Sequence, residues 1–373
     1  MLTVGISDDS SRLARFCGVP VIFILLLLLL LAPASRLALG DFKFEEGRRA
    51  IAAREMISNG NWGVPTIWGQ PYLNKPPGYP WAVAICSHFT GVVDPLTVRI
   101  PAFLSFIGLA IVMFFLGRRW GGIEAGILTS YLLVSSIELQ RKALIGETDL
   151  MLTFGIALYA LGLLDRNWGW KNGVIASIGL LIAGFSKGPA ALPYVGALIL
   201  ACQLSRGFNL RFVFISLFPL LVLLGALAIW YLQLKNGLNH LDVVSLWQSE
   251  VMRNRFNFTD LISVKHMTHF FFGGILGMIP ASFIILDKEQ CLLEWNQRGW
   301  QSISVLVSVS VPFLIFLFWP GTQPRYLLPL MPILGVWAGL HFLTQEEGVG
   351  IRRCSNLLRV MMIIGAVYVI FEA

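Results

Sequence analysis

Residues 22–31 of the chain read IFILLLLLLL, without a single polar side chain. The same character returns at Leu220–Leu227, which reads LLVLLGAL. The strands of a membrane barrel alternate between apolar and polar positions, whereas these runs are continuous and therefore predict helices. Only helices and closed barrels satisfy every backbone hydrogen bond within lipid. The sequence thus predicts an all-α integral membrane protein.

The composition excludes a water-soluble globule. Hydrophobic residues make up 56% of the 373 residues, charged residues make up 13%, and the mean hydropathy is +0.72. A soluble domain carries about a quarter charged residues. The net charge of +7 would suggest nucleic acid in a soluble protein, but the basic residues here lie in short loops, as membrane topology requires. We therefore expect membrane lipids around the chain and no nucleic-acid partner.

The apolar stretches recur from Val19 to the end of the chain. Since a span needs roughly 20 apolar residues, we expect a polytopic bundle of about 11 transmembrane helices, forming a single domain over residues 1–373. Residues 41–96 are first too polar and then too rich in Pro and Gly for ordinary spans, so they predict a long external loop with interfacial helices. The expected spans are 19–40, 97–116, 122–139, 149–165, 173–190, 191–204, 211–233, 268–286, 302–319, 326–343 and 356–372.

The first apolar run has two interpretations. Ala32-Pro33-Ala34 is a small-residue site of the kind at which a signal peptide is cleaved. We favour an uncleaved first helix, because many further spans follow it. In either case the chain from Asp41 onward emerges on the far side of the membrane.

The charged residues divide between the two sides of this predicted topology. Basic residues gather at every second turn, which the positive-inside rule assigns to the cytoplasm. The acids and several lone cations fall on the external face, although Arg141, Lys142 and Arg253 share that face and make the bias partial. The external set includes Glu45, Glu46, Lys75, Glu147, Asp149, Lys187 and Arg325.

The first external loop contains a predicted helix from Phe44 to Ile57, and there Glu45 and Arg49 stand at i, i+4 and share a face. Such a pair is also typical of an ordinary solvated helix. Further on, Lys75 precedes two prolines, which remove backbone donors and stiffen the chain. A boundary lysine can simply reach the interface, but a pre-positioned cation facing carboxylates suits a phosphate-bearing substrate.

Later turns repeat this combination of charge and bent backbone. Asp149 stands at the entrance of an apolar helix, where it either caps the helix or serves a functional site. Lys187 precedes Gly188-Pro189, and Arg325 follows Pro324. Gly and Pro beside a lone cation are expected where the backbone bends around a cavity. They are equally expected at an ordinary helix turn whose cation reaches lipid head groups. His266 and His269 are a weak metal signal, and we assign them no metal.

Several motifs follow one another in a characteristic order: Glu45-Glu46, Ala53-Arg54-Glu55-Met56, Gly60-Asn61-Trp62, Pro65, Lys75-Pro76-Pro77, Asp149, Lys187-Gly188-Pro189 and Arg325-Tyr326-Leu327-Leu328-Pro329. This ordered series resembles the bacterial branch of the dolichyl-phosphate-mannose–protein mannosyltransferase superfamily, which includes the aminoarabinose lipid A transferases. The resemblance implies a C-type glycosyltransferase fold in the bacterial plasma (inner) membrane, with the active face external. The soluble C-terminal domain of many relatives is not expected here.

The resemblance also implies a reaction. A sugar would pass from a polyprenyl-phosphate donor to a lipid, glycan or protein acceptor, with inversion. Glu45 would act as general base, with Glu46 and Asp149 as further catalytic candidates. Lys75, Arg325 and Lys187 would bind the lipid phosphate. No cofactor is implied with certainty; Asn74 replaces an acid that helps some relatives bind a divalent metal, so a metal is left open.

Two other hypotheses remain open. The predicted breaks at Gly188-Pro189 and residues 321–324 also fit the discontinuous helices of a transporter or lipid flippase. That hypothesis ranks second, because the sequence shows neither an evident internal repeat nor a charge in the middle of a predicted span. A non-catalytic partner subunit ranks last. It is allowed because Glu45 stands where the resembled family usually has an aspartate.

Overall fold

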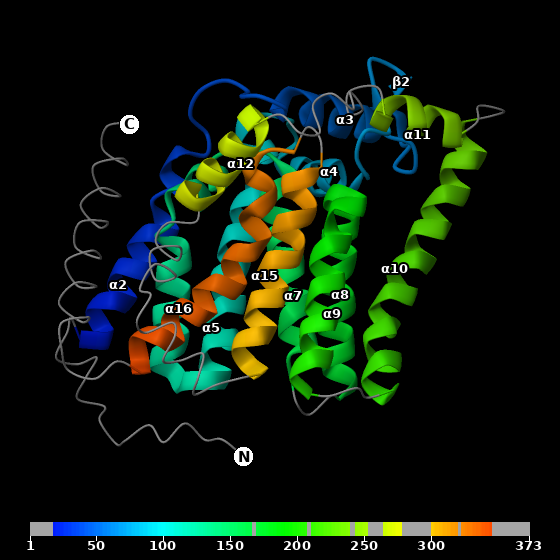
Figure 1. The fold of residues 1–373 in the computed structure, drawn as a ribbon. Coiled ribbons are helices and arrows are strands. Elements are labelled where there is room, and N and C mark those ends of the chain that lie inside the picture. Colours follow the sequence, from blue (N-terminus) through cyan, green and yellow to red (C-terminus); the bar gives the residue numbers. More distant parts are fainter. Residues whose placement is uncertain are drawn as a thin grey trace.

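The computed structural model describes residues 18–165, 169–206, 210–238, 243–252, 264–277, 300–319 and 322–344, and these are mostly helical (Figure 1). The long helices of the bundle are α2 (Gly18–Leu31), α5 (Pro95–Val134), α7 (Thr148–Leu163), α8 (Trp170–Lys187), α9 (Leu192–Arg206), α10 (Leu210–Gly237), α15 (Trp300–Phe318) and α16 (Met331–Thr344). The other helical segments outside the first loop are η1 (Ala34–Arg36), α6 (Ile137–Ala143), η2 (Gly188–Ala191), α11 (Val243–Met252), α12 (Val264–Gly277) and η4 (Pro324–Leu330).

The predicted first loop forms a layer across one end of the bundle (Figure 1). It contains two short helices, α3 (Glu46–Asn59) and α4 (Gly78–Thr90), where the sequence predicts one or two. Helix α3 begins two residues later than predicted, because Phe44 has φ 49° and does not continue a helix. Between them lies a hairpin of β1 (Thr66–Ile67) and β2 (Gln70–Pro71), which the sequence analysis did not predict.

Helix α5 bends back on itself where the sequence predicts the break between spans 97–116 and 122–139. Gly121 and Gly122 leave the helical conformation, and Gly122 has φ 77°. The Ser130 hydroxyl donates to the Ala110 carbonyl at 2.8 Å, so the two halves of α5 lie side by side. A Cβ at Gly126 would come within 2.7 Å of the Phe114 carbonyl oxygen, which explains the need for glycine at this contact.

The predicted number of spans is not confirmed. Within the described residues, three helical segments are long and apolar enough to cross a bilayer, namely Pro95–Val134, Trp170–Ser205 and Ser216–Gly237. A fourth is obtained if α6 and α7, bent by 116°, count as one span. Ile22–Arg36 and Ser304–Phe318 are shorter apolar helices. The predicted span 356–372, and residues 278–286 of another, lie outside the described residues.

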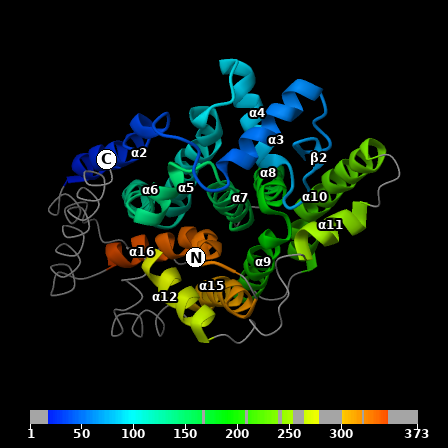
Figure 2. The same cartoon turned by 90° about the horizontal axis from the view of Figure 1, so that it is seen from above.

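Helices α7 and α8 pack closely at the centre of the bundle, and α3 and α4 lie on one side of them while α15 and α16 lie on the other (Figure 2). The close approach depends on small residues. A Cβ at Gly155 of α7 would come within 2.6 Å of the Ala183 amide nitrogen of α8, and a Cβ at Gly162 would come within 2.6 Å of the Asn172 carbonyl oxygen. These contacts pair the start of α7 with the end of α8.

Candidate functional site

The pairing of α7 with α8 brings together two residues that the sequence singles out separately. Asp149 lies in the first turn of α7, and Lys187 is the last residue of α8. Their Oδ1 and Nζ atoms are 2.5 Å apart, and both side chains are buried. Asp149 does not cap its helix, since Glu147 occupies the cap position. The capping interpretation is therefore wrong.

Three more charged side chains complete what we call the buried charge cluster. Its members are Lys142, Glu147, Asp149, Lys187 and Arg325.

Lys142 lies 3.0 Å from Asp149 and also pairs with Glu147. The Arg325 guanidinium donates to both Glu147 oxygens, at 3.1 and 3.2 Å. Arg325 also lies 3.8 Å from Asp149, so this predicted residue joins the predicted pair. The Lys187 ammonium lies 3.7 Å from the centre of the Tyr326 ring, on the face that attracts cations.

The cluster has more positive than negative charge. It contains three cations and two carboxylates, and four of the five side chains are less than a tenth exposed. A buried charge without a counter-charge is costly, because burial removes its hydration. An anion in contact with the cluster would reduce that cost, so the arrangement favours binding of a phosphate or carboxylate group.

Lys75 lies beside the cluster rather than inside it. Its neighbour Pro76 packs against Gly188, where an added Cβ would come within 3.2 Å of the proline Cγ. A Cβ at Gly78 would meet the Phe185 carbonyl oxygen at 2.6 Å, so the whole Lys75–Gly78 turn lies against the end of α8. Within the described residues, the Lys75 ammonium has no hydrogen bond or ion pair.

The surroundings of Lys75 lower the pKa of its ammonium from 10.5 to about 7. Burial is the largest cause, followed by repulsion from Arg49 and then from Lys187; Asp149 acts in the opposite direction, and Arg325 adds a smaller repulsion. This amine therefore loses its proton at a much lower pH than an ordinary lysine does. A bound anion would favour the charged form.

Glu46 is fully buried, and both of its carboxylate oxygens are occupied. Arg99 donates to them from Nε at 2.9 Å and from Nη2 at 3.0 Å. The Gly146 amide donates at 2.6 Å and the Lys43 amide at 2.7 Å. Since Gly146 immediately precedes Glu147, this carboxylate ties the start of α3 to the turn that carries the charge cluster.

Glu45 has a different environment, although it is the adjacent residue. Its side chain is 33% exposed, and it accepts two hydrogen bonds of 3.1 Å from Arg48. The predicted pairing with Arg49 is wrong, because Glu45 precedes the first turn of α3 and meets the residue at i+3 instead. Of the two adjacent acids, Glu45 is the one that is accessible from outside the protein.

The described residues contain no group of three or more His, Cys, Asp or Glu side chains arranged to hold a metal ion. His269 is exposed on α12, and the side chain of His266 lies outside the described part of the chain. The described residues therefore add no support for a divalent metal.

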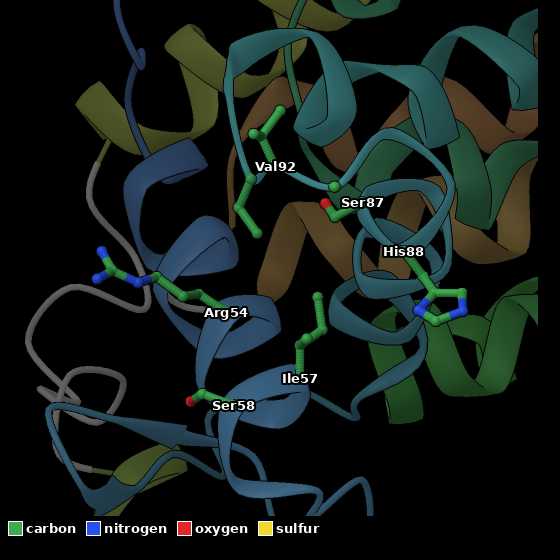
Figure 3. Close-up of a pocket in the computed structure, with 8 residues that line it drawn as sticks. Arg54, Ile57, Ser58, Ser87, His88 and Val92 are labelled. Carbon is green, nitrogen blue, oxygen red and sulfur yellow. The ribbon is translucent and has the colours of Figure 1, made fainter.

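A separate pocket of about 480 Å³ lies between α3 and α4 (Figure 3). Ile57, Val92 and Val93 give it an apolar lining, and the buried Ser87 side chain contributes a hydroxyl. The Arg54 and His88 side chains extend away from its centre (Figure 3). It contains none of the predicted site residues, so the charge cluster and this pocket are distinct features.

Four charged residues that build this region are not predicted as site residues from the sequence. Lys142 was assigned no role, and Glu147 was placed on the external face without a site assignment. Asp149 is a signal for Lys142, because a buried acid needs cations nearby. Arg99 and Arg49 lie within helices and are both about 1% exposed. An arginine inside an apolar stretch, as in TVRIPAF at 97–103, is the signal that finds Arg99.

No protein-family model matches the chain, but curated relatives do. The undecaprenyl phosphate-alpha-4-amino-4-deoxy-L-arabinose arabinosyl transferase of Shewanella sediminis is 25% identical over 339 residues, covering 88% of this chain and 60% of its own length. The enzyme of the same name from Erwinia tasmaniensis is 24% identical over 323 residues, covering 80% of this chain and 54% of its own length. The chain therefore spans less than two thirds of these relatives.

Solved structures show the same fold. ArnT from Cupriavidus metallidurans, solved bound to undecaprenyl phosphate, aligns with a TM-score of 0.75 at 19% identity, covering 93% of this chain and 63% of its own. The oligosaccharyltransferase of Archaeoglobus fulgidus aligns with a TM-score of 0.51 at 12% identity, covering 93% and 55%. The resemblance predicted from the loop motifs is confirmed: the chain has aminoarabinose transferases among its homologues and shares the membrane fold of the C-type glycosyltransferase superfamily.

Proposed function

We propose that the chain is a membrane glycosyltransferase that moves a sugar from a polyprenyl-phosphate donor to a lipid, glycan or protein acceptor. The reaction takes place at the external face of a bacterial inner membrane. One observation carries the proposal: a buried charge cluster with surplus positive charge lies next to an unpaired lysine, under the first-loop layer. The relatives named for transfer from undecaprenyl phosphate support the same donor class.

In the proposed reaction Glu45 takes the proton of the acceptor hydroxyl. The acceptor oxygen then bonds to the anomeric carbon of the sugar, on the face opposite the phosphate, and the configuration inverts. The bond between that carbon and the phosphate oxygen breaks, and its electron pair leaves with the lipid phosphate. Lys75 and Arg325 stabilise the charge that develops there.

The remaining charged residues position these groups. Asp149 holds Lys187 and, at a longer distance, Arg325 (2.5 and 3.8 Å), so it orients two cations toward the departing phosphate. Glu46 serves as an anchor in this proposal rather than as a base, because its oxygens already accept four hydrogen bonds.

The test is donor cleavage by the purified chain in detergent. A panel of radiolabelled polyprenyl-phosphate sugars is supplied with a lipid extract as acceptor, and released lipid phosphate is measured. We expect release from at least one donor and its loss in Lys75→Ala. If folded wild-type protein releases no phosphate from any donor but moves donor across a vesicle bilayer, the flippase hypothesis replaces this one.

Binding of undecaprenyl phosphate is expected to weaken as the pH rises above 7. The ammonium of Lys75 binds the phosphate, and its pKa of about 7 in the empty site means that a higher pH leaves a neutral amine. Between pH 7.5 and 8.5 the affinity should fall by roughly tenfold, since each bound phosphate then requires uptake of one proton. The second ionisation of a phosphate monoester, near pH 6, is complete in this range.

Lys75→Arg is the matched control for this prediction, because a guanidinium stays charged throughout the range. Affinity is measured by titration of the purified protein at both pH values. An equal pH dependence in wild type and Lys75→Arg would contradict the role given to Lys75.

A further inference from the structure

Two arginines are fully buried near the first loop, and they differ sharply in their partners. The five N–H groups of Arg99 all have acceptors: Glu46 takes two, and the carbonyls of Leu37, Leu39 and Asp41 take the others. Arg49, which is 1% exposed, makes one hydrogen bond, from Nη1 to the Tyr72 hydroxyl at 3.3 Å. Its Nε has no hydrogen-bond partner.

Arg49 also lacks a counter-charge. Within the described part of the chain, no carboxylate lies within 4.0 Å of its guanidinium. Among the described residues, its charge is stabilised by Tyr72 alone, through the hydrogen bond to the hydroxyl and through the ring, whose centre lies 5.7 Å from the guanidinium carbon. The desolvation free energy of such an uncompensated buried charge is larger than the stabilisation from one hydrogen bond. No group among the described residues neutralises this cation, so its position suits a further anionic ligand.

The position of Arg49 indicates which ligand. Tyr72, which holds the guanidinium, lies three residues before Lys75, and among charged groups Arg49 has the largest effect on the pKa of the Lys75 ammonium. The charged groups that act on the Lys75 ammonium are Arg49 from α3, Lys187 from α8, Asp149 from α7 and Arg325 from η4. With Lys142 and Glu147, this region holds five cations and two carboxylates when Lys75 is protonated.

We propose that Arg49 is a second anion ligand of the site, and that Arg49 and Lys75 together hold a phosphate group between the first loop and the buried charge cluster. This proposal rests on the proposed function. The planar guanidinium suits two oxygens of one phosphate, while the ammonium of Lys75 binds as a point charge. A phosphate held in this way ties α3 and the Lys75 turn to the ends of α7 and α8.

The experiment compares Arg49→Met with Arg54→Met, which removes an exposed arginine from the same helix. Arg49→Met is expected to bind undecaprenyl phosphate about 10- to 100-fold more weakly, the effect of losing a hydrogen-bonded charge. Its melting temperature without ligand should stay the same or rise, because an uncompensated buried charge is gone. Arg54→Met should leave both quantities unchanged. A structural role for Arg49 predicts the reverse: a lower melting temperature and an unchanged affinity.

Arg49→Gln provides a second readout and serves if Arg49→Met does not fold. It keeps a donor for Tyr72 but removes the charge that repels the Lys75 ammonium. The pH above which affinity declines should therefore move upward in Arg49→Gln. Affinity within twofold of wild type, with no shift of the pH profile, overturns the proposal.

Two further comparisons distinguish a failure of this proposal from a failure of the proposed function. If wild type binds undecaprenyl phosphate and Lys75→Ala loses it, while both Arg49 variants bind normally, only the role of Arg49 fails. If wild type does not bind undecaprenyl phosphate, the proposed function fails with it. Inorganic phosphate is titrated in parallel, and binding as tight as that of the lipid would overturn the assignment to a lipid-linked phosphate.

Discussion

Glu45→Gln is expected to slow sugar transfer by about 10²- to 10⁴-fold, the usual contribution of a positioned general base. Glutamine keeps the size of the side chain and can still accept a hydrogen bond from Arg48, but it cannot take a proton from an acceptor hydroxyl. Since Glu45 is one-third exposed and precedes α3, its replacement should leave the melting temperature unchanged. The measurement is the rate of sugar transfer to lipid acceptor from whichever radiolabelled donor is active.

The neighbouring Glu46 provides the comparison. Glu46→Gln breaks the paired hydrogen bonds with Arg99, because an amide offers one acceptor oxygen instead of two. It should lower the melting temperature and the yield of folded protein. If Glu46→Gln folded normally and lost transfer while Glu45→Gln kept it, the assignments of base and anchor would have to be exchanged.

Arg99→Met is expected to destabilise the protein by about 3–5 kcal/mol, the cost of removing one partner from a buried ion pair. The substitution leaves the fully buried Glu46 carboxylate without a counter-charge and leaves the carbonyls of Leu37, Leu39 and Asp41 without a donor. Unfolding of the detergent-solubilised protein by denaturant measures the effect. A loss of less than about 1 kcal/mol would show that the pair is not the anchor described above.

Two control variants test whether the loss of stability in Arg99→Met comes from the buried ion pair. Arg119→Met breaks the pair with Asp165, in which both side chains are 29% exposed, and should cost about 1 kcal/mol or less because water screens it. In the double variant Glu46→Leu/Arg99→Met, neither charge remains buried. Part of the lost stability should therefore return, as expected when a buried ion pair is replaced by apolar residues.

The sequence identified most of the residues of this region individually. Continuous apolar runs predicted the helices, and the motif order indicated Lys75, Asp149, Lys187 and Arg325. The sequence does not indicate which of these residues contact one another. Asp149 pairs with Lys187 because glycines let α7 and α8 approach closely at a particular register, and that register is a property of the packed helices.

Local details were missed for other physical reasons. The strands of the hairpin are two residues long, which is too short for any alternation to be visible. Its turn places Trp68 and Gly69 at φ 53° and 72°. A tryptophan does not predict such a positive φ, because turns of this kind usually have Asn, Asp or Gly there. The i, i+4 rule failed for Glu45 because the rule holds inside a helix, and α3 starts one residue later.

The partners of Glu46 have a consequence for biogenesis. Arg99 follows Glu46 by 53 residues and Gly146 follows it by 100, so neither is available when the first loop leaves the translocation machinery. A nascent chain halted between these two positions has the ion pair but not the Gly146 amide, and the first loop has no attachment to the α6–α7 turn. With the first loop on the external face, as proposed above, its cleavage by an external protease should persist in halted chains and cease once the turn has been inserted. The late residues determine when the early loop becomes ordered.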